Sequence, residues 1–104
     1  MSERKRKVFI INKGVHDYTA AEPFGELVFL SIRNLKKFAT SQIYRIFMPI
    51  LRKSDPEDYI LPTGLLSANL VATYIMTQLH ERVNLLLFKP GKGGRKEYIE
   101  RILK

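Results

Sequence analysis

Apolar residues at consecutive positions mark four short segments of the chain, residues 8–11, 27–32, 59–61 and 83–88. A strand that is apolar on both faces is typical of a sheet that is covered on both sides, so we expect these segments to share one sheet. A fifth segment, residues 96–103, carries a charge on each face in Glu100 and Arg101. Such charges oppose pairing with another chain, which predicts a strand at the edge of the sheet.

Two longer segments repeat their apolar residues with the period of an α-helix. The first helix is predicted to begin at an N-cap of Thr40 or Ser41 and to run to about residue 53, with Pro49 on its polar side. Its apolar side consists of Ile43, Ile46, Phe47, Ile50 and Leu51. The second helix is predicted over residues 65–81.

The predicted order of elements is therefore β-β-α-β-α-β-β. Strands separated by a helix pair in parallel through right-handed crossovers, whereas the last two strands, joined by a glycine-rich loop, form a hairpin. This order predicts the α/β class, with a mixed, mostly parallel sheet of about five strands and two main helices. We expect a single compact domain over residues 8–104, preceded by a basic N-terminal arm at residues 1–7.

Composition narrows the class of protein further. A chain of 104 residues builds one hydrophobic core, and its 45% apolar and 27% charged residues are ordinary for a folded domain. The absence of cysteine excludes disulfides, thiolate zinc sites and a cysteine nucleophile, and no cofactor is predicted. The apolar segments are too short for a secretion signal or a membrane span, so we expect a cytoplasmic protein with no membrane partner.

Charge adds a candidate partner. The chain has 18 Lys and Arg against 10 Asp and Glu, a net charge of +8. Clusters of cations bind phosphate backbones without reading sequence, and no helix-turn-helix, zinc-finger or RNP motif is present, so we predict non-specific nucleic-acid binding. The predicted binding residues are Arg4, Lys5, Arg6, Lys7, Lys36, Lys37, Lys92, Arg95 and Lys96. The alternative is that these lysine-rich turns serve solubility alone.

The second helix suggests another function. Leu66, Leu70 and Tyr74 form a stripe on successive turns, displaced from the arc around Ile75 that should face the sheet. A helix that is apolar on two sides is buried or covered by a partner. We predict a homodimer or assembly contact through this stripe. Burial under the first helix or the N-terminal loop is the alternative.

Two loops carry chemically useful groups. The long loop after the first strand carries His16, Asp17 and Tyr18. Two interpretations are open: acid–base chemistry by these groups, or an Asx turn formed by Asp17. Thr63 and Gly64 precede the second helix and are interpreted as helix capping rather than as a phosphate loop, because no glycine-rich motif is present. Neither loop completes a catalytic pattern, so a non-enzymatic protein is favoured over an enzyme.

Four runs of residues, at 16–18, 24–27, 59–63 and 84–88, resemble small proteins encoded by tailed bacteriophages. The resemblance covers most of the chain and brings no activity or functional residue with it. It implies a phage-encoded accessory protein acting in the host cytoplasm, rather than a metabolic enzyme.

Overall fold

The computed structural model describes residues 5–32 and 34–104 of the chain. Its strands are β1 (Lys7–Ile10), β2 (Glu26–Phe29), β3 (Tyr59–Leu61), β4 (Val83–Pro90) and β5 (Lys96–Leu103). Two α-helices, α1 (Thr40–Leu51) and α2 (Leu66–His80), and two 3₁₀ segments, η1 (Thr19–Phe24) and η2 (Lys92–Gly94), complete the secondary structure. No helix within these residues is both long and apolar enough to cross a membrane.

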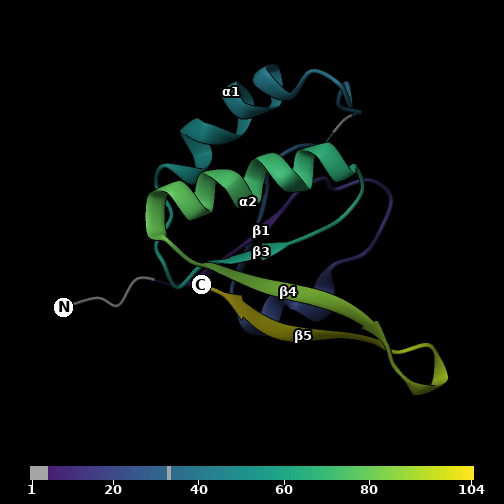
Figure 1. Cartoon of the computed structure of the whole chain (residues 1–104). Helices are drawn as coiled ribbons and strands as arrows, with labels where there is room; N and C mark the ends of the chain where they lie inside the picture. The colour runs from purple at the N-terminus through teal and green to yellow at the C-terminus, as the bar shows by residue number, and fades with distance from the viewer. Residues whose placement is uncertain (1–4, 33) are drawn as a thin grey trace.

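All five strands belong to one sheet in the order β2-β1-β3-β4-β5. Figure 1 labels β1, β3, β4 and β5 of this sheet. The first four run parallel, and β5 returns antiparallel to β4 as a long hairpin. The predicted α/β class, the mixed and mostly parallel sheet and the two main helices are confirmed.

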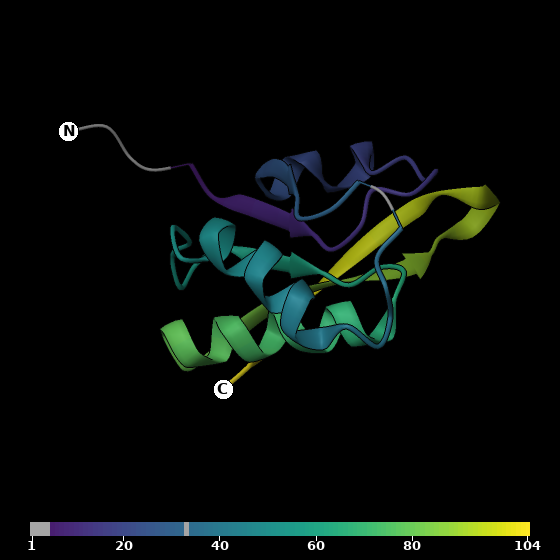
Figure 2. The same cartoon turned by 90° about the horizontal axis from the view of Figure 1, so that it is seen from above.

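The chain winds around this sheet in two directions. The first connection leads from β1 through η1 to β2, at one edge of the sheet. The second returns from β2 through α1 to β3, on the other side of β1, and the third continues through α2 to β4. Right-handed crossovers in opposite directions lie on opposite faces of a sheet. Accordingly, the strands run between α2 on one side and η1 on the other (Figures 1 and 2).

Each face of the sheet has its own apolar core. Side chains alternate between the faces along a strand, so Phe9 packs under the helices while Val8 and Ile10 pack under η1. Phe47 of α1 and Ile75 of α2 fill the helix-side core without solvent exposure. The predicted burial of the first strand on both faces is therefore confirmed.

The second strand differs from its prediction. We expected residues 27–32 to be buried on both faces, but β2 ends at Phe29 and its residues are half-buried or exposed. The reason is its position: β2 lies outside β1 at the edge of the sheet, with one neighbour only. Ile32 lies beyond the strand and is 65% exposed.

The helix caps also differ from their predictions. Ala39, rather than Thr40 or Ser41, is the N-cap of α1, and no side chain caps that end. Ile46, expected on the apolar side of the helix, is exposed. Thr63 does not cap α2: Leu65 is the N-cap residue without a side-chain cap, and the Thr63 hydroxyl is hydrogen-bonded to Tyr18 instead.

Candidate functional site

The parallel strands all end at the same edge of the sheet, which we call the carboxyl edge. The chain leaves the ends of the adjacent strands β1 and β3 toward opposite faces, toward η1 after β1 and toward α2 after β3. In open α/β sheets, the loops diverge at such a point and leave a crevice in which ligands bind.

A cavity of about 210 Å³ opens at this point. We call it the edge cavity. Three stretches of chain line it: the loop after β1, the end of β3 and the β4–β5 hairpin. Its lining residues are His16, Asp17, Tyr18, Leu61, Pro62, Thr63, Phe88, Lys96 and Tyr98.

Hydrogen bonds hold the two loops at the floor of the edge cavity. The hydroxyl groups of Tyr18 and Thr63 are 2.9 Å apart and share a hydrogen bond. The backbone N–H of Thr63 donates to the Asn69 side-chain oxygen at 3.0 Å, and the Asn69 amide donates to the Leu65 carbonyl at 2.7 Å. Gly64 has a φ of +72°, which favours glycine and turns the chain from β3 into α2.

The β4–β5 hairpin forms the outer wall of the edge cavity. It extends past the end of β3, because only the first residues of β4 pair with that strand (Figure 1). Phe88 and Tyr98 face each other across the hairpin, with ring centroids 5.9 Å apart. The Lys96 ammonium donates to the Asp17 backbone oxygen at 3.1 Å and thereby ties the hairpin to the loop after β1.

Hydrogen bonds and a neighbouring charge favour the ionised form of the Asp17 carboxyl. The side-chain and backbone hydrogen bonds from Thr19 lower the pKa of the Asp17 carboxyl, and the charge of Lys96 adds to this effect. The interpretation of Asp17 as an Asx turn is confirmed, because its carboxylate accepts from the Thr19 N–H at 2.9 Å. Burial, followed by the neighbouring Tyr18 and Asp17, raises the pKa of Tyr98, so its hydroxyl stays protonated at neutral pH.

Part of the predicted nucleic-acid set gathers at the carboxyl edge. Lys36 and Lys37 lie in the turn before α1, while Lys92, Arg95 and Lys96 lie at the hairpin tip. Two further cations belong to the same edge: Lys89 in β4, which adds to the basic charge of the hairpin, and Lys13 in the loop after β1, which the sequence pattern did not single out. The signal for Lys13 was present in the order of elements, because this residue follows a parallel strand.

The N-terminal members of that set lie elsewhere. Lys5, Arg6 and Lys7 stand at the opposite edge of the sheet, where β1 begins, and Arg4 lies outside the described residues. Arg6 forms an ion pair with Glu57 at 2.9 Å and donates to the Tyr59 hydroxyl at 2.9 Å. The fold therefore divides the predicted set between two edges.

Acidic groups accompany the cations at that second edge. The buried Asp58 carboxylate accepts from the backbone N–H of Lys7 and of Asp55, both at 2.9 Å. Glu57 also lies 3.9 Å from Arg82. Burial, followed by the hydrogen bond to Glu100, raises the pKa of Tyr59 in the same region.

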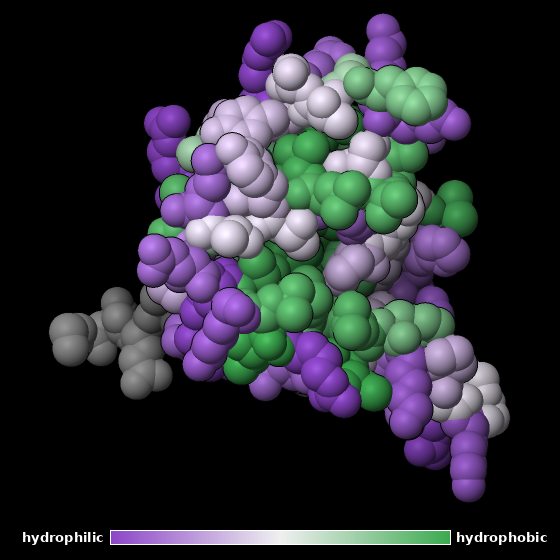
Figure 3. All heavy atoms as spheres, viewed as in Figure 1, coloured by the Kyte–Doolittle hydropathy of each residue, from purple (hydrophilic) through white to green (hydrophobic). Residues whose placement is uncertain are grey.

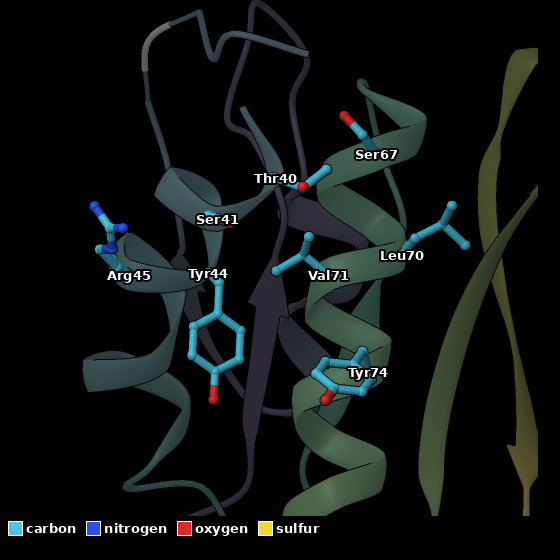
Figure 4. A pocket seen from close by; sticks show the side chains of 8 residues that line it. All are labelled: Thr40, Ser41, Tyr44, Arg45, Ser67, Leu70, Val71 and Tyr74. Atoms are coloured by element: carbon cyan, nitrogen blue, oxygen red, sulfur yellow. The ribbon is translucent and has the colours of Figure 1, made fainter. Parts of the chain in front are cut away.

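The predicted helix stripe is on the surface. Leu66, Leu70 and Tyr74 are 72%, 61% and 56% exposed, so the alternative of burial under α1 or the N-terminal loop is wrong. A groove of about 630 Å³ runs between α1 and α2, and the rings of Tyr44 and Tyr74 stand 6.3 Å apart across it. Figure 4 shows Val71 pointing toward α1 and Leu70 pointing toward β4.

The exposed apolar surface continues from α2 onto the sheet. Leu87 and Leu103 are exposed, and their register and alternation place them on the α2 side of the hairpin. Apolar side chains gather over α2 and over the β4–β5 hairpin below it (Figure 3). Helix α2 thus leaves part of this face of the sheet uncovered.

Comparisons with known proteins give one family. No curated protein and no solved structure matches the chain. The sequence model of one family, described as Phage Pam3 gp32-like protein, matches residues 6–102. This match runs from the residue before β1 almost to the end of β5, and it confirms the prediction of a phage protein. The chain therefore belongs to the family of Phage Pam3 gp32-like proteins.

Proposed function

We propose that the protein is a non-enzymatic phage accessory protein that binds nucleic acid in the host cytoplasm through contacts with the phosphate backbone. The binding surface is the carboxyl edge of the sheet. The observation that carries this proposal is the excess of cations in the separate loops of that edge. They are Lys13, Lys36, Lys37, Lys89, Lys92, Arg95 and Lys96.

Charge balance distinguishes the two edges of the sheet. The loops of the carboxyl edge, residues 11–18, 30–39, 62–65 and 88–97, include only Asp17 and Glu97 as acidic residues. At the opposite edge, Arg6 is engaged by Glu57, and Asp58 lies beside the start of β1. An excess of cations without matching anions attracts a polyanion and releases its counterions on binding.

The shape of the hairpin also supports backbone contacts. Its tip carries Gly91, Gly93 and Gly94 between exposed cations, and no bulky side chain there obstructs a strand of nucleic acid. Phosphate contacts of this kind position a protein on nucleic acid without reading bases. We therefore expect affinity with little sequence preference.

The proposal is tested by fluorescence anisotropy with labelled single- and double-stranded DNA at increasing salt. We expect micromolar dissociation constants at about 50 mM salt and a steep loss of affinity as salt rises. Neutralising Lys92, Arg95 and Lys96 together to Gln should weaken binding and lower the salt slope by about 2 to 3, because each lost phosphate contact removes about 0.7–0.9.

A matched control variant is available at the opposite edge. The control variant changes three exposed residues to Gln: Lys5, Arg52 and Lys104. It removes two lysines and one arginine, as the first triple variant does. Their loss should leave most of the affinity intact. Equal weakening by both triple variants, or no binding of the wild type at about 50 mM salt, contradicts the proposal.

The exposed apolar surface favours a second function, self-association. We propose that two copies pair across the face formed by Leu66, Leu70 and Tyr74 of α2 together with Leu87 and Leu103 of the hairpin. Burying each leucine stabilises by roughly 1.5–3 kcal/mol, and a symmetric contact buries every residue twice. Exposure of these side chains at one continuous face is the observation behind this candidate.

Light scattering coupled to size exclusion tests the dimer. We expect a dimer at high micromolar concentration and a folded monomer for Leu70→Glu, because Leu70 is exposed and tolerates a charge in the isolated chain. Val15→Glu, which adds the same charge at an exposed position in the loop after β1, should leave the dimer intact. A monomeric wild type removes this candidate.

A further inference from the structure

The edge cavity is walled largely by aromatic rings. His16 and Tyr18 form one edge-to-face pair, with centroids 6.4 Å apart, and Phe88 and Tyr98 form another on the hairpin. Aromatic side chains that stand among cations are the platforms on which proteins stack unpaired bases. The carboxyl edge thus has stacking surfaces beside its cations.

Two exposed phenylalanines reinforce this point. Phe38 and Phe88 are the exposed phenylalanines among the described residues: Phe88 lines the edge cavity, and Phe38 lies beside the start of α2 at the carboxyl edge. The Lys37 ammonium lies 5.1 Å from the Phe38 ring, and Phe88 is followed directly by Lys89. Exposure of a large apolar ring to water is unfavourable, and stacking against a ligand removes the ring from water.

Size limits the ligand. The edge cavity, at about 210 Å³, is smaller than the roughly 300–1,000 Å³ of pockets that take drug-sized molecules. The edge cavity is therefore of a size to bind a planar group of one or two rings. The hydroxyl groups of Tyr18 and Thr63 and the protonated hydroxyl of Tyr98 supply the hydrogen-bonding groups that the edge of such a ring requires.

The rim of the edge cavity is suited to a phosphate. Lys96 lies there with its ammonium on the Asp17 backbone oxygen, and Lys89, Lys92 and Arg95 surround a second hollow at the hairpin tip. A nucleotide combines a planar base, which fits inside the edge cavity, with a phosphate, which fits at its rim. A duplex hides its bases, so only an unpaired strand presents both halves at once.

We infer that the edge cavity receives one unpaired nucleobase of a single-stranded nucleic acid while the neighbouring phosphates lie on the lysines of the hairpin. This inference rests on the proposed function and adds its substrate class, single strands in preference to duplexes. Phe88 is the stacking residue at the mouth, and Lys96 positions the hairpin wall against the loop after β1.

The test separates bases from phosphates. An oligothymidylate of about 12 nucleotides is compared with an abasic oligomer of the same length, which has the same charge and no bases. We expect wild type to bind the oligothymidylate about 5- to 150-fold more tightly, the range for stacking one base. The same preference should hold against a duplex of equal length.

Two variants assign the effect to the edge cavity. Phe88→Ala and His16→Ala, both at exposed positions, should bring the affinity for oligothymidylate close to that for the abasic oligomer and leave the salt slope unchanged. Ile102→Ala is the matched control, because Ile102 is an exposed apolar residue of β5 that pairs with the start of β4, away from the edge cavity. Circular dichroism verifies that each variant is folded.

The outcomes distinguish the inference from the proposed function. Equal affinity for both oligomers, with a steep salt dependence, overturns the base-binding inference and leaves phosphate binding standing. The same conclusion follows if Ile102→Ala removes the preference as strongly as Phe88→Ala. Absence of salt-dependent binding to either oligomer overturns the proposed function itself.

Discussion

The hydroxyl groups of Tyr18 and Thr63 share a hydrogen bond of 2.9 Å that joins the loop after β1 to the loop after β3. These loops leave the sheet toward opposite faces, so the path of the chain leads them apart. The hydrogen bond links them directly. The bond spans 45 residues of sequence and forms the floor of the edge cavity.

Removal of this bond should destabilise the protein measurably. Tyr18→Phe deletes one buried hydroxyl and leaves the ring in place, so we expect the free energy of unfolding to fall by about 0.5–1.5 kcal/mol in urea denaturation. Tyr74→Phe is the matched control, because its hydroxyl accepts from Gln78 on an exposed helix surface. A change for Tyr74→Phe as large as that for Tyr18→Phe would contradict this account.

Asp17 should titrate below its ordinary value of 3.8 because Thr19 hydrogen-bonds its carboxylate. Its folded pKa lies below the unfolded one, so its contribution to stability is present above the unfolded pKa and is lost as pH falls through the folded pKa. Carboxyl-carbon NMR titration measures this shift directly. Thr19→Ala should return the pKa toward 3.8, whereas Thr73→Ala, on α2, should not change it.

The end of α2 contains a conformation that favours glycine. Glu81 follows the helix with a φ of 56°, in the left-handed region that costs a residue with a Cβ atom roughly 1–2 kcal/mol. Glu81→Gly should therefore raise the free energy of unfolding by about 0.5–1 kcal/mol, offset in part by the greater freedom of glycine in the unfolded chain. Arg82→Gly, next along the chain, should lower it.

The two sides of α2 should respond differently to truncation. Ile75 is fully buried beneath the helix, so Ile75→Ala should cost about 2–5 kcal/mol of unfolding free energy. Leu70→Ala on the exposed side should change the stability of the isolated chain by no more than about 0.5 kcal/mol. Comparable losses at both positions would show that the stripe belongs to the core.

Much of the fold could be predicted from local patterns of apolar and polar residues. Apolar runs in β1, β3 and β4 predicted central strands because a strand covered on both faces needs apolar side chains on both. The apolar period of α2 predicted the helix. Its second stripe, Leu66, Leu70 and Tyr74, predicted a homodimer or assembly contact, which stays a prediction, and the structure places these side chains on the surface. The hairpin of β4 and β5 followed from its glycine-rich loop.

Only the tertiary structure decided the strand order and what it brings together. An apolar run does not specify its neighbours, so nothing in residues 27–32 predicted that β2 would take an edge position beside β1. The same order divides the cations between two edges and places the ring of Phe88 near His16, 72 positions earlier in the chain. Local residue patterns determine elements, but the edge cavity depends on contacts between distant loops, which only the assembled sheet creates.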